Sequence, residues 1–106
     1  MSTLDPNRDH SITLEDAIEF TKRYRNSETF NGKKGGFFGK TALQSMLDQE
    51  GAAGIRYYYG IDNENTPVLV LVAATEDNVD LYNGELAEMS MPCPTFCDLD
   101  SPLSND

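Results

Sequence analysis

The chain lacks long hydrophobic runs and is poor in the residues that nucleophilic catalysis uses. No stretch approaches the roughly 18 consecutive apolar residues that a membrane span needs, and the start, MSTLDPNRDH, has no apolar signal segment. There is no tryptophan, and the 106 residues include one histidine and two cysteines. A triad of serine, histidine and acid could form only around His10. These absences argue against a membrane protein and a triad hydrolase, and they predict a cytoplasmic location.

Basic residues are also scarce, and they are unevenly placed. Eight lysines and arginines stand against 18 acids, and the formal charge of −10 repels nucleic acid and anionic lipid. We therefore expect neither nucleic acid nor a membrane as partner. Six of the eight bases lie between Lys22 and Lys40, whereas residues 41–106 carry one base, Arg56, against twelve acids. The basic segment is typical of a solvated helix end and loop; a small-anion site and a self-association surface are the sharper alternatives.

The length and composition fit one small globular domain. The chain has 39% apolar residues and 8 glycines, close to the globular average. We expect a polar leader over residues 1–11, a single α+β domain over residues 12–97, and a disordered acidic tail over residues 98–106.

Two helices are predicted before any strand. Apolar residues recur at helical spacing over residues 13–25, where Thr13 can cap the start and acids precede bases along the segment. A second helix is expected over residues 40–50, with a stop at Gly51. Residues 26–39, between the helices, predict a loop. Its phenylalanines should tuck beneath the core: Phe30, Phe37 and Phe38.

A small antiparallel sheet should follow the helices. Residues 55–61 alternate as a half-buried strand does, and residues 68–74 are apolar throughout. The polar turn over residues 62–65 predicts a hairpin, with residues 79–82 as a third strand. Because both faces of an entirely apolar strand need cover, we expect a second copy of the chain to complete one face or one edge.

The C-terminal part is predicted to be irregular. Residues 85–89 predict one helical turn, and prolines prevent regular structure beyond it, namely Pro92, Pro94 and Pro102. The fold class is therefore α+β, with two N-terminal helices, a small antiparallel sheet and an irregular tail rich in proline and cysteine.

The stretch GGFFGKT ends in Gly-Lys-Thr, like the phosphate-binding loop of nucleotide hydrolases. That motif needs a glycine five residues before Gly39, where this chain has Lys34. It also follows a strand, whereas a helix and a polar linker are expected here. We therefore do not expect nucleotide hydrolysis, and a small anion at the start of the second helix stays open.

The polar leader carries oxygen-bearing side chains at alternate positions, as an EF-hand calcium loop does. They are Asp5, Asn7, Asp9, Ser11, Thr13 and Asp16. His10 stands where the loop needs a glycine, and Asp16 stands where it needs the longer glutamate. We therefore interpret this segment as a polar leader that runs into a capped helix.

Cys93 and Cys97 can bind zinc or iron, form a disulfide, or pack as reduced thiols. They are weak metal candidates, because a structural zinc needs four ligands and the other soft ligand, His10, is far away in sequence. No base nearby would lower a thiol pKa. We expect reduced, packed thiols and a tail anchored by Phe96, with no metal and no cofactor.

Three consecutive tyrosines lie in the first predicted strand. Alternate side chains point to opposite faces, so Tyr57 and Tyr59 can join the core while Arg56 and Tyr58 share the other face. An exposed tyrosine with an arginine is a common binding hot spot, although tyrosines in strands more often simply pack.

Several segments together resemble a family of short bacterial proteins of uncharacterised function. They are ITLEDAIEFTKRYR, FFGKTAL, GIRYYYG, LVLVAA and PCPTFC, which span about residues 11–97. The resemblance implies an α+β fold with a GIRYYYG-type strand and a Pro-Cys-Pro-x-x-Cys tail, and it implies no catalytic or cofactor residues.

These features favour a small, non-enzymatic binding or interaction protein that acts as a homodimer. The alternative is a small enzyme or ligand sensor with an aromatic pocket between the phenylalanine-rich loop and the sheet. Phe30, Tyr57 and Tyr59 would help to line that pocket, and a base would fix an anionic group in it. The ligand-binding candidates are Phe37, Phe38, Lys40, Arg56 and Tyr58.

Overall fold

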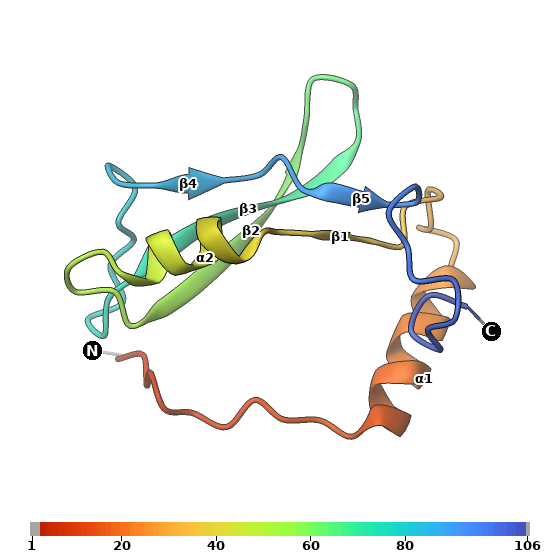
Figure 1. Cartoon of the computed structure of the whole chain (residues 1–106), viewed down its shortest axis with the longest axis horizontal. Helices are drawn as coiled ribbons and strands as arrows, with labels where there is room; N and C mark the ends of the chain where they lie inside the picture. The colour runs from red at the N-terminus through yellow and green to blue at the C-terminus, as the bar shows by residue number, and fades with distance from the viewer. Residues whose placement is uncertain (1–2, 106) are drawn as a thin grey trace. The chain divides into compact units, whose positions relative to one another are not determined.

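The computed structural model describes residues 3–105. Residues 1, 2 and 106, which belong to the expected leader and tail, lie outside the described residues. The residues form two compact units, and each unit is described by itself; the single domain expected over residues 12–97 stays a prediction. The first unit comprises residues 3–8 together with Phe38–Met89. The second comprises Asp9–Phe37 and residues 90–105. Figure 1 colours the elements along the chain.

A β-hairpin forms the centre of the first unit. β2 (Gly54–Ile61) pairs antiparallel with β3 (Pro67–Ala74) over the full length of both strands, with Tyr57 opposite Leu71. Aromatic and branched side chains, which favour extended backbone, dominate both strands. The predicted hairpin is therefore confirmed.

The turn of this hairpin is built around one carboxylate. The Asp62 side chain accepts hydrogen bonds from the backbone N–H groups of Glu64 and Thr66, at 2.8 and 2.9 Å. Asn65 takes a positive φ of 64°, a conformation that asparagine tolerates better than most residues. The polar residues of the turn thus stabilise its backbone conformation.

A third strand pairs with the other side of β3, but its position differs from the predicted one. It is β4 (Leu86–Ala87), antiparallel to the centre of β3. The segment expected to be the third strand, residues 79–82, contributes a single bridge between Ala74 and Asp80. The prediction of a helical turn over residues 85–89 was wrong. Leu86 and Ala87 instead pair with the edge of β3, whose backbone groups would otherwise be buried without partners.

α2 (Lys40–Leu47) packs against β2 and β3. The sequence predicted that this helix ends at residue 50, whereas it ends at Leu47. The Gln49 side chain donates a hydrogen bond to the Met46 carbonyl at 3.0 Å, and the Gln49 backbone N–H donates to the same carbonyl at 3.4 Å. These bonds close the last turn, and Gly51 then takes a φ of 86° that redirects the chain.

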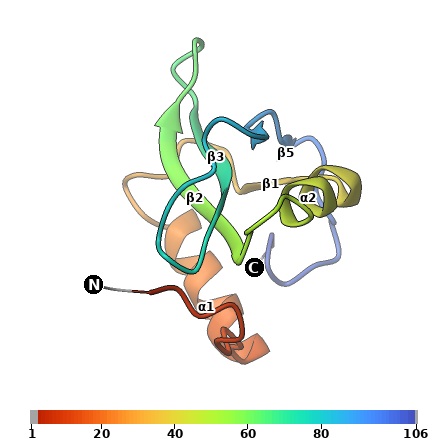
Figure 2. The ribbon, with the colours of Figure 1, turned by 90° about the vertical axis from the view of Figure 1, so that its left-hand side faces the viewer.

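The core of the first unit lies at the C-terminal half of β3. Its buried side chains are exposed by 7% or less: Met46, Leu71, Val72, Ala73 and Ala74. The N-terminal half of β3 is equally apolar in sequence, yet its residues are half-buried or exposed. Figures 1 and 2 both show the turn between β2 and β3 extending beyond α2 and β4. Within the described chain, β3 is therefore covered over half its length.

α1 (Leu14–Arg25) belongs to the second unit and confirms the first predicted helix. The Thr13 hydroxyl accepts a hydrogen bond from the Asp16 backbone N–H at 3.0 Å, as expected of a helix cap. Acids lie in the first turn and bases in the last, which complements the helix dipole. None of its twelve residues is buried, so its apolar stripe contributes little to a core.

A two-stranded sheet in the second unit joins β1 (Gly35–Phe37) to β5 (Met91–Cys93) in antiparallel pairing. This pairing corrects the expectation of a loop throughout the segment between the helices and of an irregular tail. Both strands of a two-stranded sheet are edge strands, where proline is tolerated, so Pro92 fits opposite Gly36. A Cβ atom on Gly36 would lie 2.5 Å from the Ser90 hydroxyl oxygen, so the close approach requires glycine.

The three phenylalanines that we expected beneath the core differ in their surroundings. The Phe30 ring packs edge-to-face on Tyr24, with ring centroids 5.5 Å apart. Phe38 is half-buried, in agreement with the expectation. Phe37 is 58% exposed, so its predicted burial was wrong; β1 is held by backbone pairing and leaves this ring in solvent.

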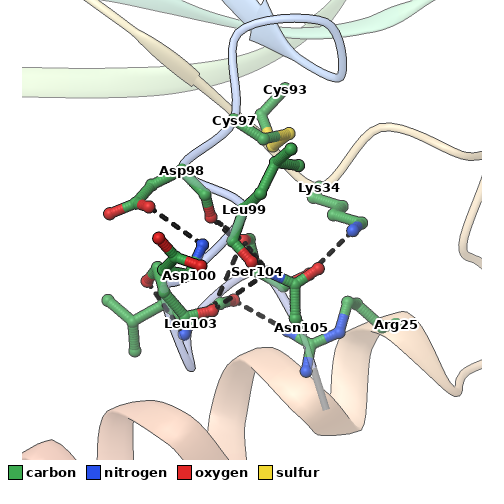
Figure 3. The surroundings of a disulfide bond; sticks show 11 residues. Arg25, Lys34, Cys93, Cys97, Asp98, Leu99, Asp100, Leu103, Ser104 and Asn105 are labelled. Carbon is green, nitrogen blue, oxygen red and sulfur yellow. Dashed lines mark hydrogen bonds between the residues drawn. A yellow bond between two sulfur atoms is a disulfide. The ribbon is translucent and has the colours of Figure 1, made fainter.

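The C-terminal segment over residues 98–105, expected to be disordered, forms hydrogen-bonded turns (Figure 3). Two cations of the same unit contact it. Arg25 donates to the Leu103 carbonyl and Lys34 donates to the Ser104 carbonyl, each at 2.7 Å. Part of the basic segment therefore binds carbonyl groups of this chain.

Met46 provides a test of the core of the first unit. We expect Met46→Ala to lower the free energy of unfolding by about 2–5 kcal/mol, because it leaves a cavity at a fully buried position. The control is Leu47→Ala on the same helix, where the side chain is 44% exposed and the loss should be much smaller. Urea unfolding followed by circular dichroism measures both, and equal losses would contradict the position of the core.

Candidate functional site

One face of the β2–β3 hairpin carries exposed apolar side chains, which we call the aromatic face. It consists of Tyr57, Tyr59, Ile61 and Leu69, exposed by 55%, 83%, 71% and 37%. The strand register places these residues on the same side of the sheet, because Tyr59 lies directly opposite Leu69 and the others lie two positions away. Tyr57 and Tyr59, which the sequence allowed to join the core, are therefore exposed. Tyr57 lies opposite Leu71, which pairs with Ala87 of β4, whereas Tyr59, Ile61 and Leu69 lie closer to the turn than the residues that pair with β4.

The two tyrosines of the aromatic face contact each other. Their rings are edge-to-face, with centroids 5.6 Å apart. Hydrogen bonding with Tyr57 raises the pKa of Tyr59 above its ordinary value, because it favours the neutral phenol. The resulting stabilisation is present below the ordinary tyrosine pKa and is lost as the pH rises through the raised pKa. At neutral pH the aromatic face is uncharged.

The opposite face of the hairpin carries a polar cluster, which consists of Arg56, Tyr58, Asn78 and Asp80. The Arg56 guanidinium lies 2.7 Å from one carboxylate oxygen of Asp80 and also donates to the Asn78 side chain. The Tyr58 hydroxyl donates to the second oxygen of Asp80. The bridge between Ala74 and Asp80 brings the carboxylate to this face. The prediction that Arg56 and Tyr58 share a face is confirmed.

The polar cluster is internally balanced. Arg56 and Asp80 side chains are 27% and 20% exposed, so the pair is partly shielded from solvent. The interaction with Tyr58, followed by the charge of Asp80, raises the pKa of Arg56 above its ordinary value, and the guanidinium stays charged at all working pH values. Because Asp80 already neutralises Arg56, the cluster is better suited to fastening the segment after β3 onto the hairpin than to binding an anion.

The five ligand-binding candidates do not line a common cavity in the described part of the chain. Phe37 belongs to the second unit, whereas the other four belong to the first. Two open depressions of the first unit have volumes of about 400 and 560 Å³. One is lined by residues 49–50 and 79–84, and the other by residues of α2 and β4. None of the five candidates lines either depression.

Lys40, at the start of α2, is exposed, and the residue at the capping position, Gly39, has no side chain that could cap the helix. The small-anion site proposed there from the sequence stays a prediction. Asn78 and Asp80, by contrast, were missed as members of the cluster around Arg56. A usable signal was present, because Arg56 is the single base of residues 41–106, where twelve acids favour an ion pair with one of them.

Cys93 and Cys97 form a disulfide, with 4.8 Å between their Cα atoms (Figure 3). The expectation of reduced thiols is overturned. A tight turn returns the chain: the Phe96 backbone N–H donates to the Pro92 carbonyl at 2.8 Å, which brings Cys97 back beside β5. Phe96, expected to anchor the tail, is 58% exposed, so the disulfide and the backbone bonds take that role. Both sulfurs are bonded to each other and are not thiolate ligands.

The calcium-loop-like leader uses its oxygens locally. The Asp5 carboxylate accepts the Asn7 backbone N–H at 2.9 Å, and the Asp9 carboxylate accepts the Ser11 backbone N–H at 2.8 Å. Hydrogen bonds from the side chain and backbone of Ser11 lower the pKa of Asp9. Over residues 3–105 no group of three or more histidine, cysteine or acidic side chains is arranged to hold a metal ion.

No family model, no curated protein and no solved structure matches this chain. The resemblance to short bacterial proteins therefore stays a prediction. Among the described residues, no helix has the length and apolar character required to cross a membrane.

The Arg56–Asp80 pair can be tested by a double-mutant cycle. With Arg56→Met and Asp80→Asn, we expect a coupling energy of about 1 kcal/mol, because the pair is partly shielded and hydrogen-bonded. The comparison is the Arg23–Glu19 pair of α1, whose side chains are 68% and 62% exposed. That cycle should give less than about 0.5 kcal/mol. Urea unfolding measures both, and no coupling between Arg56 and Asp80 would contradict the fastening role.

The disulfide can be tested by replacing both cysteines with alanine. In the chain-entropy account, loss of so short a loop removes about 2 kcal/mol of stability. We expect faster amide hydrogen exchange in β1, β5 and residues 98–105, and unchanged exchange in β2 and β3. The control is Thr95→Ser, which keeps the disulfide and lies exposed in the same turn. Equal exchange in the two variants would show that the disulfide does not hold this segment.

Proposed function

We propose that this protein is a non-enzymatic interaction module that acts as a homodimer through the β2–β3 hairpin. The observation that carries the proposal is the aromatic face, where Tyr59 and Ile61 are 83% and 71% exposed in the turn-proximal half of a regular strand. Contiguous exposed apolar side chains on a folded element are typical of a protein interface. Tyrosine is among the residues that contribute most to binding energy at such interfaces.

The charge distribution also supports a protein interface at this hairpin. Neither strand contains an acid, although the whole chain has a formal charge of −10. Arg56, the one charged residue of the two strands, is neutralised by Asp80 on the opposite face. Two copies can therefore approach along these strands without bringing uncompensated like charges of the strands together.

The alternative function, a small enzyme or ligand sensor, has less support. It requires an aromatic pocket, and the residues proposed to line that pocket lie outside both defined depressions. Tyr57 and Tyr59 lie on an open sheet face, where water has free access to both rings. A cavity that excludes water is what small-molecule sites ordinarily provide.

The cytoplasmic location stays a prediction, and the disulfide provides its test. Disulfides persist in oxidising compartments and are rare in the cytosol, where thiols are kept reduced. Rapid acid quenching of native cells followed by thiol labelling should find Cys93 and Cys97 as thiols in a cytosolic protein. Unlabelled cysteines would place the protein in an oxidising compartment.

Self-association predicts a specific effect of one tyrosine. We expect sedimentation equilibrium and light scattering at two salt concentrations to show a dimer, and Tyr59→Ser to weaken it roughly tenfold or more. The control is Tyr82→Ser, which removes another tyrosine of the first unit, 67% exposed, that lies outside the aromatic face. A monomer under every condition would refute the proposal, as would equal effects of the two substitutions.

A further inference from the structure

We infer that two copies associate by pairing their β2 strands edge to edge, antiparallel, with the two-fold axis passing at Tyr58. The inference rests on the homodimer proposed above and specifies how it forms. Pairing of this kind would join the three-stranded sheets of two copies into one continuous sheet. The partner is thus a second copy of this chain, and the contact is made first by backbone groups.

The free edge of β2 is the first observation behind this inference. The strand order is β2-β3-β4, so within residues 3–105 β2 pairs with β3 alone. It is a strand of eight residues. Half of its backbone N–H and C=O groups point away from β3, because these groups alternate in direction along a strand. Such an edge is a template for another strand.

Nothing in β2 protects this edge. Natural edge strands are blocked by lysine, proline, a bulge or an inward-pointing charge. β2 contains no lysine and no proline, and its register with β3 runs without interruption from Gly54 to Ile61. Its one charged residue, Arg56, bonds to Asp80 and Asn78 on one face of the sheet. An unprotected edge of this length is expected to be used.

The four residues of β2 on the side of the aromatic face are symmetric about Tyr58, and this symmetry is the basis for the register that we infer. Counting outward from Tyr58, Tyr57 matches Tyr59 and Ile55 matches Ile61. Antiparallel pairing about this centre puts Tyr57 opposite the partner's Tyr59. It also puts Ile55 opposite the partner's Ile61. Aromatic and branched residues in directly opposed pairs are the combinations that stabilise antiparallel strands, and here they all lie on the side of the sheet that bears the aromatic face.

The remaining positions of this register contain no conflict. Arg56 lies opposite the partner's Gly60, which has no side chain to obstruct the guanidinium. At the ends of the strand, Asp62 lies opposite the partner's Gly54, so no two carboxylates are opposed. A dimer of this kind does not depend on attraction between opposite charges. Raising the salt concentration should therefore leave it intact or strengthen it by screening the net negative charge.

Cysteine crosslinking tests the register. Directly opposed residues of antiparallel strands have Cβ atoms about 4.5–5.5 Å apart, which disulfide formation can bridge. We expect Tyr58→Cys to form a covalent dimer in mild oxidant, because this position faces itself across the axis. The matched control is Ile61→Cys on the same strand, which is more exposed than Tyr58, at 71% against 48%. Two copies of that position would be about 20 Å apart and should not crosslink.

A second pair of variants leaves the polar cluster intact. Ile55→Cys and Ile61→Cys chains, each poor at linking to itself, should crosslink when mixed. Non-reducing electrophoresis measures the covalent dimer formed by Ile55→Cys alone, by Ile61→Cys alone and by the mixture of the two. A monomer in sedimentation would overturn both the proposed function and this inference. A dimer in which Ile61→Cys links to itself, or in which neither Tyr58→Cys nor the mixed pair links, would overturn edge pairing and leave the homodimer standing. Dissociation of the dimer by added salt would also count against edge pairing and favour charge-driven docking.

Discussion

Backbone pairing on both sides of β3 is the constraint on which the first unit depends. β2 pairs with it along its whole length, and β4 and the bridge at Asp80 pair with its other side. A buried strand cannot leave its N–H and C=O groups unbonded, so the chain that follows β3 has to return along it. That return brings Asp80 to Arg56, and it also provides the part of the cover over the core that α2 does not supply.

The same constraint explains why the two faces of the hairpin differ. The returning segment and α2 reach the C-terminal half of β3, where Leu71 and Val72 are buried. They do not reach the turn, so the part of the aromatic face nearest to the turn, Tyr59, Ile61 and Leu69, stays open. Arg56 and Tyr58 instead receive Asp80 on the other side. Charge is thereby confined to one face, and the face left open is apolar.

How far the sequence predicts this structure depends on how local the signal is. Thr13 with the acids after it predicted α1, and the alternation around Tyr57 and Tyr59 predicted the hairpin. β4 was missed because two residues carry no periodicity, and only the pairing requirement of β3 reveals it. The disulfide was not chosen because the spacing of Cys93 and Cys97 fits three chemical states, and the turn that brings the two sulfurs together depends on a backbone bond from Phe96 to Pro92 that the sequence does not reveal. Asp80 was missed because a non-local bridge positions it.

The strong negative charge of the chain and the uncharged edge of β2 are compatible because the acids are segregated. Carboxylates lie in the hairpin turn, in the segment after β3 and in the C-terminal residues, whereas β2 and β3 contain none. Net charge keeps such a protein from associating indiscriminately, since most approaches bring like charges together. In the dimer that we propose, the approach along β2 is the exception, because β2 itself carries only apolar or neutral side chains and Arg56, which Asp80 compensates. Segregated charge therefore favours one mode of contact by disfavouring the others.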